Sequence, residues 1–204
     1  MNSLLFYQAT TAFLGALFMF HGMDVRHKEG ARDFVAPVWQ LLMKLCAWLL
    51  IAGFAWLVAS MREPGMIDWL GLALGASGTA FVVAAKWTLG DAHTFTGQHL
   101  ERSGLVTHGV YAITRNPLYF GVFQCELCML LVTLHQLPLL RPEDSLYWCG
   151  LFAAALVYAV SFNLRMAGRE ACYLELCFGD AYRRYRSTVP FLVPLFSPNS
   201  RGIQ

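Results

Sequence analysis

The sequence predicts an all-α integral membrane protein with five transmembrane helices, a C-terminal amphipathic helix at the membrane interface and no Rossmann domain. Of its 204 residues, 57% are hydrophobic and only 14% are charged, whereas soluble domains average about 25% charged residues. A chain this short cannot enclose such an apolar excess in a water-exposed globule. The net charge of +2 gives no indication of nucleic-acid binding. Disordered chains and coiled coils are excluded because neither tolerates long apolar runs.

Five apolar runs are long enough for a helix to cross the hydrocarbon core, which takes about 20 residues. They cover approximately residues 3–21, 37–60, 66–88, 118–140 and 146–167. Residues 61–65 form a short connection with Pro and Gly, which predicts that the second and third runs are antiparallel neighbours. Residues 141–145 supply a turn and an N-cap before the fifth run. We expect residues 1–204 to form a single membrane domain.

Three glycines recur in the third run: Gly71, Gly75 and Gly78. No strand precedes them, so they lack the context of a dinucleotide-binding loop. Small residues at this spacing are typical of close packing between membrane helices.

The basic residues indicate an orientation. Three of the fifteen Lys and Arg residues lie in 22–36, three in 86–117 and six in 165–204, whereas the two short hairpins hold only Arg62 and Arg141. Because basic residues accumulate in cytoplasmic loops, we expect a multi-pass protein with its N-terminus outside and its C-terminus in the cytoplasm. An odd number of spans agrees with this arrangement.

The region after the fifth run predicts one amphipathic helix suited to the membrane interface. Its apolar face would consist of Leu174, Phe178, Ala181, Tyr182 and Tyr185. Residues 189–194 contain two prolines and should end this helix as an extended apolar segment.

Glu126 is an unusual residue for the fourth run, because a carboxylate at the centre of a membrane costs about 2.5–3.5 kcal/mol. It is either a protonated or hydrogen-bonded packing residue, or it contacts a polar or cationic part of a substrate. The neighbouring Cys125 and Cys128 form a CxxC without further Cys or His ligands at suitable spacing, so we expect no metal site.

Residues 104–121 form the densest motif, a glycine-hinged loop that carries Tyr111, Arg115 and Tyr119 and is restricted by Pro117. Such a loop suits either ligand contacts at the membrane surface or an interfacial anchor of aromatic and arginine side chains.

This motif resembles the LVTxGxYxxxRHPxYxG motif of the isoprenylcysteine carboxyl methyltransferase (ICMT) family. Residues 169–190 resemble the same family's REExxLxxxFGxxYxxY…VP signature. The resemblance covers roughly residues 95–196, and the five spans fit the smaller microbial members. It implies a membrane-embedded methyltransferase that uses S-adenosylmethionine and takes a hydrophobic or lipidated acceptor from the bilayer.

The resemblance implies that the cofactor is bound by residues 95–121 and 165–196. The residues expected to contact it are Leu105, Val106, Tyr111, Arg115, Asn116, Pro117, Leu118, Tyr119 and Glu170. A carboxylate at Glu170 can accept hydrogen bonds from the ammonium or ribose hydroxyls of the cofactor, and aromatic rings can pack on adenine or face the sulfonium.

Methyl transfer from a sulfonium needs an oriented nucleophile more than a strong acid or base, in a site closed to water. We expect Arg165, Arg169 and Glu170 to be the catalytic residues, because an arginine can hold an acceptor carboxylate by two hydrogen bonds. Arg165 and Glu126 are the expected substrate contacts. Arg165 could instead be an ordinary snorkelling residue at the end of a span.

Three positions depart from the family pattern. Asn116 stands where the family usually has His, Ala171 where it often has a second Glu, and Met166 where prenylcysteine enzymes have an arginine implicated in carboxylate binding. A lipid amine, a small thiol or another hydrophobic acceptor therefore remains open. The alternatives are an NADPH-dependent membrane reductase related to sterol reductases, which share an Arg-x-Pro-x-Tyr-x-Gly turn, and a non-enzymatic scaffold or transporter.

Overall fold

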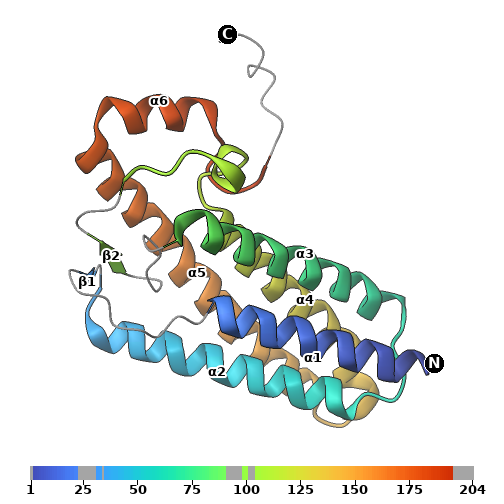
Figure 1. The fold of residues 1–204 in the computed structure, drawn as a ribbon. Helices are drawn as coiled ribbons and strands as arrows, with labels where there is room; N and C mark the ends of the chain where they lie inside the picture. Colours follow the sequence, from blue (N-terminus) through green and yellow to red (C-terminus); the bar gives the residue numbers. More distant parts are fainter. Residues whose placement is uncertain (1, 23–30, 34, 91–97, 101–103, 195–204) are drawn as a thin grey trace.

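A computed structural model of the protein describes residues 2–22, 31–33, 35–90, 98–100 and 104–194. Its long helices form a bundle, and a two-stranded antiparallel ribbon lies at one end (Figure 1). The helices are α1 (Ser3–Gly22), α2 (Pro37–Ser60), α3 (Met66–Leu89), the 3₁₀-helix η2 (Gly109–Ala112), α4 (Pro117–Leu140), α5 (Ser145–Phe178) and α6 (Asp180–Thr188); the strands are β1 (Ala31–Asp33) and β2 (Gln98–Leu100).

Helices α1 to α5 are each long and apolar enough to span a membrane, which confirms the five predicted spans and an integral membrane protein. Pro37 and Pro117 each occupy the first position of a helix, where the missing N–H of proline would have no partner anyway. No Rossmann-type sheet occurs among the described residues, whose strands pair only with each other.

Helices α3 and α4 pack with their backbones in contact. A Cβ atom added at Gly78 would lie 2.5 Å from the carbonyl oxygen of Gly121, and one added at Gly121 would lie 2.5 Å from the carbonyl oxygen of Gly78. Gly71 and Gly75 face α4 in the same way, with side-chain atoms 2.9 Å and 3.1 Å from an added Cβ. The predicted role of the three α3 glycines in close helix packing is confirmed, and Gly121 is their counterpart on α4.

A buried carboxylate joins the α2–α3 connection to α4 at the end of the bundle opposite α6 (Figure 1). Asp68 is fully buried. Its Oδ2 atom accepts hydrogen bonds from the backbone N–H of Gly65 at 2.7 Å and from Nε2 of Gln136 at 2.6 Å, and it lies 2.9 Å from Nδ1 of His135. These bonds fix the hairpin that makes α2 and α3 antiparallel.

Helix α5 continues beyond the predicted span to Phe178, so the apolar face predicted for one tail helix is shared between two helices. The chain turns at Gly179, whose φ of 50° lies in the left-handed region that glycine adopts without strain. Arg186 of α6 then pairs with Glu175 of α5 at 2.8 Å across this turn. The predicted apolar face is consequently divided, with Leu174 and Phe178 in α5 and Ala181, Tyr182 and Tyr185 in α6.

Helix α6 is itself amphipathic. Tyr182 and Tyr185 are buried against the bundle, whereas Arg183, Arg184 and Arg186 are exposed. The predicted C-terminal amphipathic helix is therefore present, shortened to the residues after the turn.

The glycine contact predicts a stability effect. Gly78→Ala should destabilise the protein by about 1–3 kcal/mol, because the new Cβ meets backbone rather than a flexible side chain. Gly53→Ala is the matched control, since an added Cβ at Gly53 has no atom within 4 Å. Thermal unfolding in detergent, followed by tryptophan fluorescence, should show a lower Tm for Gly78→Ala alone. Equal Tm values for both variants would contradict the packing described here.

Candidate functional site

Three side chains that the sequence predicts to bind a cofactor converge where η2, the first turn of α4 and the last turns of α5 meet. The Tyr119 hydroxyl from α4 hydrogen-bonds the Glu170 carboxyl group from α5. Burial raises the pKa of the Tyr111 phenol of η2, and the nearby Glu170 carboxylate raises this pKa further. Tyr111 therefore stays protonated and can donate a hydrogen bond, while Glu170 offers acceptor oxygens beside two aromatic rings.

The loop that carries Tyr111 is held by the tail strip, which we define as residues 189–194. Oγ1 of Thr114 donates a hydrogen bond to the carbonyl of Leu192 at 2.8 Å, and Nδ2 of Asn116 donates one to the carbonyl of Phe191 at 2.8 Å. Thr114 and Asn116 are both buried. An irregular loop is thus given fixed backbone partners without a sheet.

Arg115 is the second connection between the loop and the C-terminal segment. Its backbone N–H donates to the Pro190 carbonyl at 2.9 Å, and its Nε donates to the Val189 carbonyl at 3.0 Å. The guanidinium also donates to the Tyr182 hydroxyl at 3.3 Å and lies 5.4 Å from the centre of the Phe191 ring. The geometry therefore gives both Arg115 and Asn116 partners in the protein itself.

Helix α6 is anchored to η2 by a further bond. The Tyr185 hydroxyl donates to the Tyr111 carbonyl at 2.7 Å. Burial raises the pKa of Tyr185, although the positive charge of Arg115 opposes this rise, so the phenol remains a donor. The position of Tyr111 thus depends on residues more than seventy positions away in the chain.

The remaining predicted cofactor residues lie around this convergence. Leu105 and Val106 are half-buried in the segment before η2, and Pro117 is buried at the first position of α4. Leu118 follows and lines a cavity in the bundle. The structure describes residues 104–121 of the predicted region 95–121 in full, and residues 91–97 and 101–103 lie outside the described residues.

The two predicted catalytic arginines lie on a different face of α5. Arg165 and Arg169 are exposed, whereas Asn163 and Met166 are buried and Glu170 is half-buried. Residues 163, 166 and 170 share one face of an α-helix by their spacing. Met166, 3% exposed, therefore packs in the core where the ICMT pattern has arginine.

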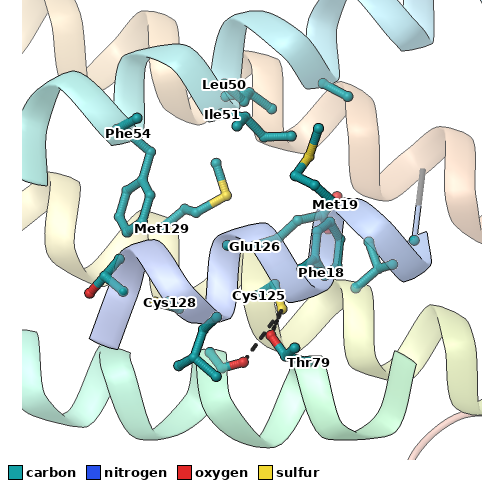
Figure 2. Close-up of a pocket in the computed structure, with 18 of the residues that line it drawn as sticks. Phe18, Met19, Leu50, Ile51, Phe54, Thr79, Cys125, Glu126, Cys128 and Met129 are labelled. Atoms are coloured by element: carbon teal, nitrogen blue, oxygen red, sulfur yellow. Dashed lines mark hydrogen bonds between the residues drawn. The ribbon is translucent and has the colours of Figure 1, made fainter. Parts of the chain in front are cut away.

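A cavity of about 630 Å³ lies inside the bundle and is lined by residues of all five long helices (Figure 2). Its lining is mainly apolar and includes Phe18 and Met19 of α1 and Leu50 of α2. Leu118 also lines it, so the cavity reaches the segment that precedes Tyr119. Sequence patterns did not reveal this cavity, because five separate helices contribute its apolar walls and no single one encodes it.

Glu126 of α4 faces this cavity (Figure 2) and is 9% exposed. Its carboxyl group hydrogen-bonds the side chain of Asn163 on α5. Its Oε2 atom has no hydrogen-bond partner among the residues that the structure describes. A buried polar group without a partner costs about 1–3 kcal/mol, so this oxygen is a candidate contact for a molecule in the cavity.

Comparison with known proteins connects this site to a family. A model of the phospholipid methyltransferase family matches residues 66–181, more than half of the chain. The chain belongs to the phospholipid methyltransferase family. The matched segment contains the whole of α3, η2, α4 and α5, and with them Tyr111, Tyr119 and Glu170.

A curated relative agrees with the family match. The protein-S-isoprenylcysteine O-methyltransferase of Schizosaccharomyces pombe is 28% identical over 171 residues, which cover 76% of this chain and 65% of that protein. The chain thus spans just under two thirds of the relative's length. Both names are those of methyltransferases, which confirms the resemblance found in the two sequence motifs.

The contacts of Arg115 predict that the tail strip depends on its side chain. Arg115→Met should speed amide hydrogen exchange in residues 111–116 and destabilise the protein by about 1.5–3 kcal/mol, the usual value of a hydrogen bond to a charged group. Arg184→Met is the control, because Arg184 is exposed on α6. Exchange can be followed by mass spectrometry of peptides from the loop. Equal exchange in the two variants would show that the guanidinium does not hold the strip.

Proposed function

We propose that this member of the phospholipid methyltransferase family transfers a methyl group from S-adenosylmethionine to a hydrophobic or lipidated acceptor. The observation that carries the proposal is the convergence of Tyr111, Tyr119 and Glu170 from three separate segments inside the family-matched region. The alternatives of an NADPH-dependent reductase and a non-enzymatic scaffold or transporter are not favoured by the family match.

The residues present fit the cofactor chemically. S-adenosylmethionine supplies an electrophilic methyl on a sulfonium, together with an ammonium group and two ribose hydroxyls that donate hydrogen bonds. Glu170 would accept hydrogen bonds from these donors, and the rings of Tyr111 and Tyr119 would stabilise positive charge by cation–π contact. Leu105, Val106, Pro117 and Leu118 would supply apolar contacts around them.

Arg115 and Asn116 would support cofactor binding indirectly. Their polar groups are occupied by the tail strip and α6, so they would hold the loop in the conformation that presents Tyr111. An amide at Asn116 suffices for this role, because donating to the Phe191 carbonyl requires no proton transfer.

The acceptor would enter the cavity from the bilayer and reach the cofactor past Leu118. Alignment of the acceptor atom with the methyl group, in a site closed to water, would supply most of the rate enhancement. An ionised carboxylate or thiolate acceptor needs no general base. Arg165 and Arg169 lie exposed on a different face of α5 and do not line the cavity, so they would not hold the acceptor beside Glu170. Glu126 would contact the acceptor inside the cavity.

The acceptor of the S. pombe relative is an isoprenylcysteine by name. In this chain, the buried Met166 replaces an arginine of the ICMT pattern and cannot bind a carboxylate. This replacement favours a different hydrophobic acceptor, such as a lipid amine or a thiol.

The site would face the cytoplasm. The exposed residues Arg165, Arg169, Arg183, Arg184 and Arg186 all lie at or near the end of the bundle where α6 crosses it (Figure 1). The opposite connections carry only Arg62 and Arg141. Because basic residues accumulate on the cytoplasmic side, this distribution supports an outside N-terminus and a cytoplasmic C-terminus.

Cofactor binding tests the role of Glu170. Glu170→Gln should weaken the binding of labelled S-adenosylmethionine about tenfold or more, because a charged acceptor is replaced by a neutral one in a partly buried site. Asp180→Asn is the control, since Asp180 is exposed on α6. An unchanged isotherm for Glu170→Gln, measured on purified protein in detergent, would refute the site assignment.

Ligand-dependent stability separates methyl transfer from reduction. Saturating S-adenosylmethionine should raise the Tm of the wild-type protein, whereas NADPH should leave it unchanged, because only a bound ligand stabilises the folded state. The wild-type protein, reconstituted into membranes and given methyl-labelled cofactor and lipid extracts, should yield a labelled lipid-soluble product identifiable by mass spectrometry. Protection by NADPH alone would reverse the assignment.

A further inference from the structure

The cavity contains a polar pair, which we define as Glu126 and Asn163. Both side chains line the cavity and are buried, with exposed fractions of 9% and 3%. They hydrogen-bond each other, and Oε2 of Glu126 has no partner within the described part of the chain. The pair therefore presents an unsatisfied acceptor to a largely apolar space.

Other polar residues of the lining have partners in the protein, and Lys44 of α2, the lysine of the lining, is among them. Gln8 donates to the Val58 carbonyl at 3.0 Å, and Thr11 donates to the carbonyl of Tyr7 at 2.9 Å. Thr79 contacts the Cys125 sulfur at 3.9 Å (Figure 2). Among the described residues that line the cavity, Oε2 of Glu126 is thus the buried side-chain atom without a partner.

Each member of the polar pair lies seven residues from a proposed cofactor contact on the same helix. Glu126 follows Tyr119 by seven residues on α4, and Asn163 precedes Glu170 by seven residues on α5. Seven residues return a helix to nearly the same face and advance it by about 10 Å. Because α4 and α5 run in opposite directions, both members of the pair lie about two turns farther from the η2 end than Tyr119 and Glu170.

At this position the pair can discriminate between molecules that enter the cavity. A purely apolar ligand would leave Oε2 buried without a hydrogen bond, whereas a ligand with a donor at this depth would satisfy it. The cavity therefore binds the ligand with the donor more tightly, because the apolar ligand leaves a polar group unpaired.

We propose that the cavity selects an acceptor that carries a hydrogen-bond donor, a hydroxyl or amino group, within its apolar portion, about two helical turns from the methylated atom. This hydroxyl or amino group donates a hydrogen bond to Oε2 of Glu126, while Asn163 holds the carboxyl group in place. The inference rests on the proposed function, since it takes the cavity to be the acceptor site.

Direct binding of two fatty acids tests the selection without requiring methyl transfer. Oleic and ricinoleic acids differ by one chain hydroxyl and can be supplied, radiolabelled, to the wild-type protein in phosphatidylcholine nanodiscs. We expect ricinoleic acid to bind about tenfold more tightly than oleic acid, the upper range for one hydrogen bond. Glu126→Leu should remove this preference and still bind oleic acid.

Thr133→Val provides the matched control. Thr133 lies seven residues beyond Glu126 on α4 and also has a buried side-chain oxygen without a partner among the described residues, but it does not line the cavity. This variant should keep the wild-type preference. Equal binding of the two acids by the wild type, no saturable binding of either, or a preference that survives Glu126→Leu would each overturn the inference.

Two measurements keep this inference separate from the proposed function. If S-adenosylmethionine binds but the hydroxyl preference is absent, only the selection by Glu126 is refuted. If the preference is present but S-adenosylmethionine does not bind, the proposed function fails while the cavity remains a selective lipid site. Should Glu126→Leu not fold, Glu126→Met removes the same acceptor with an unbranched side chain, and the same loss of preference is expected.

Discussion

Backbone contact between α3 and α4 is the constraint on which the rest of the molecule depends. Lipid tails are as apolar as the helices themselves, so close van der Waals packing at small residues does much of what the hydrophobic effect does in water. The contact at Gly78 and Gly121 fixes α4 within one helical turn of Tyr119. The far end of α3 also supports η2, because the Thr88 side chain lies against Gly109, whose φ is 60°.

One part of the site, residues 104–116, is mostly irregular backbone. Such a segment needs side chains to satisfy its polar groups, and here Thr114, Arg115 and Asn116 bind the carbonyl groups of the tail strip. Sequence-distant segments thereby fix each other's shape. The family motif combines the proposed cofactor contacts with residues whose contacts are inside the protein, and only the structure separates the two groups.

The sequence allowed prediction of whatever depends on length, composition and local spacing. Apolar runs located the five spans, and glycine spacing identified the α3 face. The division at Gly179 was missed because a helical pattern does not reveal a positive φ. Asn163 was overlooked for a different reason: its importance comes from lying opposite Glu126 on another helix. The cavity was also beyond prediction, since no single run encodes its shape.

The location of the cavity within the membrane-spanning part of the bundle affects how turnover of any lipid acceptor should be described. Such an acceptor partitions into the bilayer and encounters the enzyme by lateral diffusion. Its effective concentration is then a mole fraction of the membrane lipids. Adding inert lipid at constant total acceptor would slow the reaction by surface dilution, and a KM expressed per volume of solution would have no fixed meaning.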